Sequence, residues 1–159
     1  MRIALLAAAL ALIATPTLAA ELTATQLTRQ LQAEGPKATV QQLWNSGAYD
    51  SVLNHVASGD PAWIALAARL ASGADAAASE SLTIALAEAL PKNPGAVLAI
   101  LGPAVTALSP ARVCGAPFIE MAAPDLRNYL SQTRTSVSAV STPALGSSRA
   151  ACLAALPLD

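Results

Sequence analysis

Apolar residues recur every three or four positions along most of this chain, which is the spacing of one face of an α-helix. The clearest example covers residues 49–56, where positions i, i+3, i+4 and i+7 are Tyr49, Val52, Leu53 and Val56. The same period continues through residues 60–101 as three helices that end near Gly73, Pro91 and Leu101. No stretch alternates apolar and β-branched residues with polar ones as a strand does, so the pattern predicts an all-α fold.

The other expected helices flank this central block. The same spacing places them at about residues 25–34, 36–46, 126–140 and 143–156, and a short helical piece ends at Leu108. Gly35-Pro36 separates the first two, and Gly102-Pro103 interrupts the chain after the central block, because proline cannot continue a helix. The sequence therefore predicts about seven or eight short helices.

Four pairs of residues read as helix starts, because a residue that can cap a helix precedes a proline that favours the first helical position. These pairs are Asp60-Pro61, Asn93-Pro94, Ser109-Pro110 and Thr142-Pro143. Short helices are marginal alone and must bury their apolar faces against one another. We predict a stack of short antiparallel helical hairpins, resembling a helical repeat only in outline. The expected core is Trp44, Leu53, Val56, Trp63, Leu66, Leu70, Leu82, Leu86, Leu98 and Leu130.

The first 20 residues have the pattern of a bacterial signal peptide. Met1-Arg2 supplies a positive charge, residues 3–14 form an uncharged apolar run, and residues 15–20 are mostly small. We expect cleavage after Ala19 or Ala20, which sends residues 21–159 to the periplasm, or outside the cell, as one all-helical domain. The apolar run is shorter than the roughly 20 residues that a spanning helix needs, so an uncleaved anchor is the weaker alternative.

Charge and hydropathy limit the kinds of partner that the chain can have. After cleavage the chain keeps eight basic and ten acidic residues, a formal net charge of −2, and no cluster of Lys and Arg suggests binding to nucleic acid. The 19 uncharged residues between Lys92 and Arg112 suggest a membrane span, but Pro103 would break it in the middle. We therefore expect no stable membrane insertion after signal cleavage.

Two cysteines, Cys114 and Cys152, follow the signal peptide. An exported chain with an even cysteine count favours a disulfide between them, and two buried thiols are the alternative. The bridge would close a loop of about 38 residues, which the chain-entropy model values at about 4 kcal/mol. We expect it to hold the aperiodic residues 114–120 as a loop that folds Phe118 and Ile119 back onto the core.

Candidate chemistry is sparse. His55 is the single histidine, so a zinc site lacks ligands, and no serine stands in a Gly-x-Ser-x-Gly elbow. No nucleotide, haem or calcium motif occurs, so we predict no cofactor and no metal. Glu120 and Asp125 flank the Phe118 loop, with Arg112 and Arg127 near in sequence, and a surface cluster of ion pairs is the simpler explanation.

These observations favour a small exported helical protein without chemistry of its own. The leading hypothesis is a protein-interaction module that binds, and so neutralises or chaperones, another exported protein, as a monomer or homodimer. Its candidate interaction surface is Phe118, Glu120, Asp125, Arg127 and His55. The alternative is a periplasmic hydrolase that uses Glu120 or Asp125, with His55 brought near by the fold.

Overall fold

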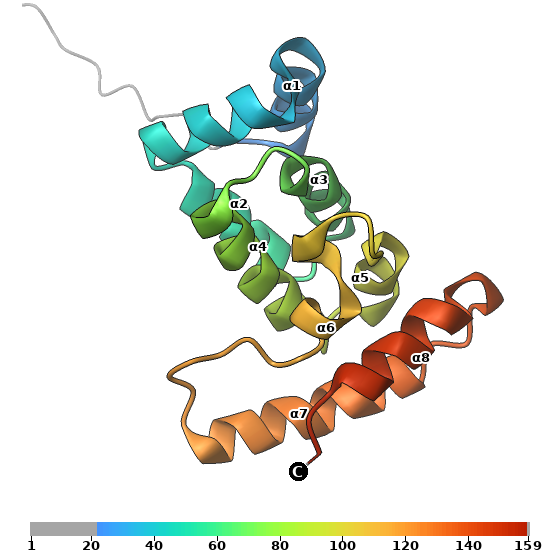
Figure 1. The fold of residues 1–159 in the computed structure, drawn as a ribbon. Helices are drawn as coiled ribbons and strands as arrows, with labels where there is room; N and C mark the ends of the chain where they lie inside the picture. The colour runs from blue at the N-terminus through green and yellow to red at the C-terminus, as the bar shows by residue number, and fades with distance from the viewer. Residues whose placement is uncertain (1–21, 159) are drawn as a thin grey trace, which may run out of the picture.

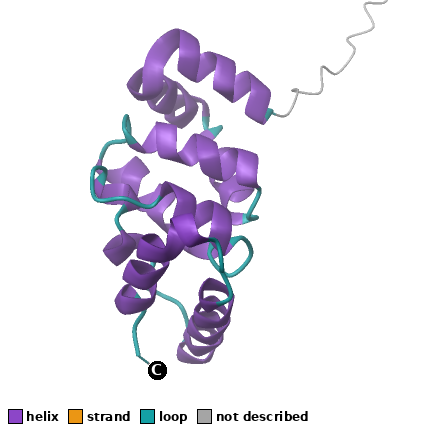
Figure 2. Cartoon of the chain, turned by 90° about the vertical axis from the view of Figure 1, so that its right-hand side faces the viewer, coloured by secondary structure: helices purple, strands orange, loops and turns teal. Residues whose placement is uncertain are grey.

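The structure, a computed structural model, describes residues 22–158, and these form helices and links without any strand (Figures 1 and 2). The predicted signal peptide and its cleavage site lie outside the described residues. The α-helices are α1 (Ala24–Ser46), α2 (Tyr49–Ala57), α3 (Pro61–Ala71), α4 (Ala76–Ala89), α5 (Pro94–Ile100), α6 (Pro110–Val113), α7 (Ala123–Ser138) and α8 (Gly146–Ala155). Two 3₁₀ turns, η1 (Thr106–Leu108) and η2 (Pro143–Leu145), complete the fold. The all-α prediction is confirmed for this part of the chain.

Helix α1 consists of two helical segments around a kink, as the Gly35-Pro36 pair predicts. Gly35 has φ 78° and ψ 168°, a conformation that no helical residue adopts and that glycine tolerates without strain. Gly73, after α3, packs directly against this kink. A Cβ added there would lie 2.3 Å from the Lys37 nitrogen, so the close contact between the two segments requires glycine.

Two of the four predicted proline caps form in the structure. The Asp60 side chain accepts hydrogen bonds from the backbone N–H groups of Ala62 and Trp63, and the Asn93 side chain accepts one from Ala96. Ser109-Pro110 starts α6 as predicted, but the Ser109 side chain makes no cap hydrogen bond. The prediction that Thr142-Pro143 starts the last helix was wrong. Thr142 precedes the 3₁₀ turn η2, and α8 begins only at Gly146, because the chain turns once more before the last helix.

The helices pack mainly on the next helix but one. Helix α1 contacts α3, α2 contacts α4, and α3 contacts α5, as the layers of Figure 1 show. The core lies between these layers and includes eight of the ten residues predicted for it: Val56, Trp63, Leu66, Leu70, Leu82, Leu86, Leu98 and Leu130.

Two core predictions need correction. Leu53 is only half-buried, and Trp44 exposes 47% of its surface. Trp44 contacts the ring of Tyr49, with 5.6 Å between ring centroids, but almost half of its own surface stays exposed. Its helix, α1, lies at one end of the part of the chain that the structure describes (Figure 1). Tyr49 is the buried member of this pair, at 2% exposure, and its hydroxyl donates to the Ala78 carbonyl at 3.0 Å.

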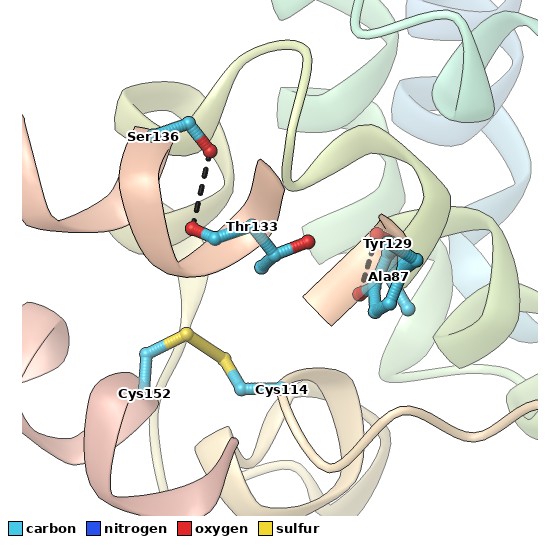
Figure 3. Close-up of a disulfide and its surroundings, with 6 residues drawn as sticks. All are labelled: Ala87, Cys114, Tyr129, Thr133, Ser136 and Cys152. Carbon is cyan, nitrogen blue, oxygen red and sulfur yellow. Dashed lines mark hydrogen bonds between the residues drawn. A yellow bond between two sulfur atoms is a disulfide. The ribbon is translucent and has the colours of Figure 1, made fainter. Parts of the chain in front are cut away.

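The last third of the chain is held by the predicted disulfide. Cys114, at the end of α6, is bonded to Cys152 in α8, with 5.3 Å between their Cα atoms, and both residues are fully buried (Figure 3). Helix α7 is fastened to the first part of the chain by Tyr129, whose hydroxyl donates to the Ala87 carbonyl of α4 at 3.0 Å. The disulfide prediction is confirmed.

The link between α6 and α7 stands away from the helices on the left of Figure 1. The prediction that it folds both Phe118 and Ile119 onto the core was wrong for Ile119, which exposes 87% of its surface. Phe118 is half-buried against Tyr129. Within residues 22–158, no helix has the length and apolar character needed to cross a bilayer.

Candidate functional site

Residues 114–122 form an irregular link whose conformation is determined at its start. A Cβ on Gly115 would lie 2.3 Å from the Ala111 carbonyl oxygen, so only glycine fits as the chain leaves α6. Ala116 follows with φ 55°, the left-handed region that non-glycine residues seldom adopt, and its carbonyl accepts a hydrogen bond from the Phe118 N–H at 2.8 Å. After this turn Phe118 points inward and is half-buried against Tyr129.

Phe118 meets Tyr129 edge to face. Their ring centroids are 4.8 Å apart and the ring planes cross at 83°, the favoured geometry of an aromatic pair. Since the Tyr129 hydroxyl is bonded to Ala87 in α4, the loop is attached through two successive contacts to the central helix. The link is thus fixed at Cys114 by the disulfide and at Phe118 by the aromatic pair.

An open hollow of about 700 Å³ lies beside this link. Residues 117–122 line it together with Ile84 of α4 and Asp125 in the first turn of α7, and we call it the Phe118 hollow. Its lining is mainly apolar, with Glu120 and Asp125 as the two carboxylates. An apolar surface with few polar groups is the usual composition of a binding site.

A second, smaller hollow of about 250 Å³ shares the lining residue Ile84 with the first. It lies between α2 and α4, which pack side by side in Figure 1, and we call it the α2–α4 hollow. It is lined by Leu53, Asn54, Ala57, Ser81, Ile84, Ala85 and Glu88.

Glu88 also acts on the aromatic pair electrostatically. Burial raises the pKa of Tyr129 to about 12, and the negative charge of Glu88 adds to this effect because it disfavours a second anion nearby. The Tyr129 hydroxyl therefore stays protonated, and can donate to Ala87, up to a higher pH than a free tyrosine would. Burial likewise raises the pKa of Tyr49, with a smaller contribution from the charge of Asp75.

The structure brings together three of the five predicted surface residues. Phe118, Glu120 and Asp125 share the Phe118 hollow, whereas Arg127 is an exposed residue of α7 outside its lining. His55 lies elsewhere: its ring stacks on Trp63 at 4.4 Å between centroids, in a hollow of about 240 Å³ that Leu22, Thr23 and Ala24 complete. The hydrolase alternative needs His55 beside Glu120 or Asp125, and the structure places it in this other hollow.

Ile84 and Met121 line the site but were not among the predicted residues. Ile84 had a signal in the sequence: it stands midway between Glu80 and Glu88, at i and i+4 spacing, and so puts an apolar residue in the middle of a polar helix face. Met121 had no such signal in the sequence, since it lies in an aperiodic loop.

The described residues, 22–158, contain no group of three or more His, Cys, Asp or Glu side chains placed to hold a metal ion. The carboxylates of the Phe118 hollow, Glu120 and Asp125, are both exposed. Comparison with protein-family models, curated proteins and solved structures finds no match to this chain.

Proposed function

We propose that this protein is a non-catalytic protein-interaction module that binds another exported protein through the Phe118 hollow. The observation that carries the proposal is Ile119, which exposes 87% of its surface at the edge of a mainly apolar hollow. A single exposed apolar side chain is ordinary, but one that borders an open apolar hollow forms a continuous patch, and such patches mark interaction sites.

Charge defines the partner further. Glu120 and Asp125 border the apolar surface, so a complementary segment places an apolar side chain in the hollow and a Lys or Arg beside these carboxylates. The site is also ordered before binding, because the disulfide at Cys114 and the Phe118–Tyr129 pair hold the loop. Such preorganisation lowers the entropy that binding costs.

The cellular setting belongs to the same proposal. It includes cleavage of the signal peptide after Ala19 or Ala20 and a periplasmic or secreted location, which the pattern of residues 1–20 supports. It also includes the arrangement of residues 21–159 as one domain of stacked antiparallel hairpins, as monomer or homodimer. In this setting the module neutralises or chaperones its partner by covering an apolar segment of it.

Site-specific crosslinking tests the proposal. A photocrosslinking amino acid replaces Ile119 in one version and Leu158 in another, since Leu158 is equally exposed, at 89%, but lies outside the hollow. After irradiation in cells, we expect one defined partner joined at position 119 and not at position 158.

The captured partner is then purified and its affinity measured. Ile119→Asp should weaken binding by at least about tenfold, since a charge would enter an apolar contact, while Leu158→Asp should leave it unchanged. No crosslinked partner at position 119, or equal affinity for wild type and Ile119→Asp, would refute the proposal.

A further inference from the structure

The Phe118 hollow and the α2–α4 hollow meet at Ile84, which is part of both linings, and we refer to the two together as the groove. The α4 residues of this groove, Ser81, Ile84, Ala85 and Glu88, stand at i, i+3, i+4 and i+7 and so follow one stripe along the helix. At 1.5 Å per residue this stripe is about 10 Å long, and the Phe118 hollow adds the surface of residues 117–122 beside Ile84. The surface therefore offers room for a rod-shaped ligand and not only for one side chain.

The groove is acidic. Three carboxylates line it, Glu88 in one hollow and Glu120 with Asp125 in the other, and no Lys or Arg is among the lining residues of either. Lys92 lies at the edge of the α2–α4 hollow, where its ammonium group donates to the Ala57 carbonyl. A ligand that contacts both hollows therefore meets carboxylates in each of them, together with apolar side chains.

We infer that the occupant of this groove is a cationic amphipathic α-helix of the partner, with its apolar face on Ile84 and Ile119 and Lys or Arg toward the three carboxylates. The inference rests on the proposed function and specifies its ligand. Ala57, Ser81 and Ala85 are small, which lets a helix axis approach closely between α2 and α4. Strand addition has no template, since residues 22–158 contain no sheet edge.

A designed peptide tests this inference without knowledge of the natural partner. The probe is an 18-residue peptide of Leu and Lys at amphipathic helical spacing, and its binding is followed by fluorescence anisotropy. A peptide with Glu in place of every Lys tests the sign of the charge, and one with a central proline tests the need for a helix. We expect both to bind at least tenfold more weakly than the Leu–Lys peptide.

Two charge reversals on α4 locate the binding site. Glu88→Lys removes a carboxylate of the groove, whereas Glu80→Lys makes the same change two turns away on an exposed position that lines neither hollow. We expect Glu88→Lys to weaken binding of the Leu–Lys peptide at least tenfold and Glu80→Lys to change it less than twofold. Both variants should keep the wild-type circular dichroism spectrum.

Each contrary result identifies which of the two proposals is wrong. A dissociation constant for the Leu–Lys peptide above about 1 mM, equal losses for the two reversals, or tight binding of the proline peptide overturns the helical ligand. If Ile119→Asp weakens binding of the purified partner while Glu88→Lys leaves its affinity unchanged, the proposed function stands. In that case only the inference that the ligand extends along the groove is refuted. A dimer of this chain that dissociates in both Ile119→Asp and Glu88→Lys would assign the groove to a second copy and refute the inference.

Discussion

Helices α4 and α7 have similar lengths but opposite roles. Helix α4 has 14 residues and buries seven of them, whereas α7 has 16 residues and buries only Leu130, Thr133 and Val137. The first helix is covered on several sides by α2, α3 and α6, while the second lies at the periphery of the molecule against α5 and α8. The two helices represent two regions, residues 22–100 and residues 101–158.

The difference shows that the two regions use different sources of stability. In residues 22–100, large apolar side chains such as Leu70, Leu82 and Leu86 are completely buried, so the hydrophobic effect can hold the helices together. In residues 101–158 few large side chains are buried, and a covalent bond between α6 and α8 supplies what packing does not. The Phe118 hollow lies where these two regions meet.

The largest predicted effect comes from breaking the core of the first region. Trp63 is 5% exposed, and Trp63→Ala should lower the free energy of unfolding by about 3–5 kcal/mol because it removes a large buried ring and leaves a cavity. Trp44→Ala is the matched control, since 47% exposure leaves little to lose, and should cost no more than about 1.5 kcal/mol. Urea denaturation of both variants measures the contrast. Equal losses would contradict the assignment of Trp63 to the core and Trp44 to the surface.

The second prediction concerns residues 101–158, which the disulfide holds together. Replacing both Cys114 and Cys152 by Ala opens a loop closed across 38 residues, and the free energy of unfolding should fall by about 2–4 kcal/mol. The loss should be uneven: protease cleavage within residues 115–122 should accelerate more than cleavage at the α1 kink, which the bridge does not constrain. Mass spectrometry after alkylation without reductant should find no modified cysteine in the wild type. Unchanged stability of the double variant would show that packing alone holds α6 to α8.

Alkaline pH tests the two tyrosines that fasten helices to α4. Folded-state burial raises the pKa of Tyr129 from 10 to about 12, and it also raises that of Tyr49. Their contribution is therefore complete below the unfolded-state pKa of about 10 and is lost as the pH rises from there, when the unfolded chain releases protons that the folded chain keeps. The free energy of unfolding should fall by at most about 1.4 kcal/mol per pH unit for each tyrosine.

Single Phe substitutions show how much of this pH dependence comes from each tyrosine. Tyr129→Phe and Tyr49→Phe should each flatten the pH dependence of the urea midpoint above pH 10, roughly by half, because each removes one titrating hydroxyl. The Tyr129 variant should in addition loosen α7, which loses its hydrogen bond to Ala87. A pH dependence that is the same in both variants and the wild type would mean that other groups titrate.

The helical period and the Asp60 and Asn93 caps were predictable because they depend on neighbours within one turn. The exposure of Trp44 was not predictable, since the period tells which face of a helix is apolar but not whether another helix covers it. The prediction that Ile119 folds onto the core was wrong for a related reason. The disulfide fixes the loop at Cys114, but the turn at Ala116 directs only Phe118 inward. The hollow itself depends on Ile84, 35 positions before Ile119, and such distant contacts leave no local pattern.

The smallest predicted effect compares two proline caps, one from each region. The Asn93 side chain accepts a hydrogen bond from the Ala96 N–H and donates one to the Gly59 carbonyl at 2.9 Å, whereas Ser109 makes no cap hydrogen bond. Asn93→Ala should therefore lower the free energy of unfolding by about 1–2 kcal/mol, and Ser109→Ala should change it by less than about 0.5 kcal/mol. Asn93→Asp separates the two bonds of Asn93, because a carboxylate still caps Ala96 but cannot donate to Gly59. Its stability should lie between those of the wild type and Asn93→Ala, and a loss in Ser109→Ala as large as in Asn93→Ala would show that α6 also depends on a side-chain cap.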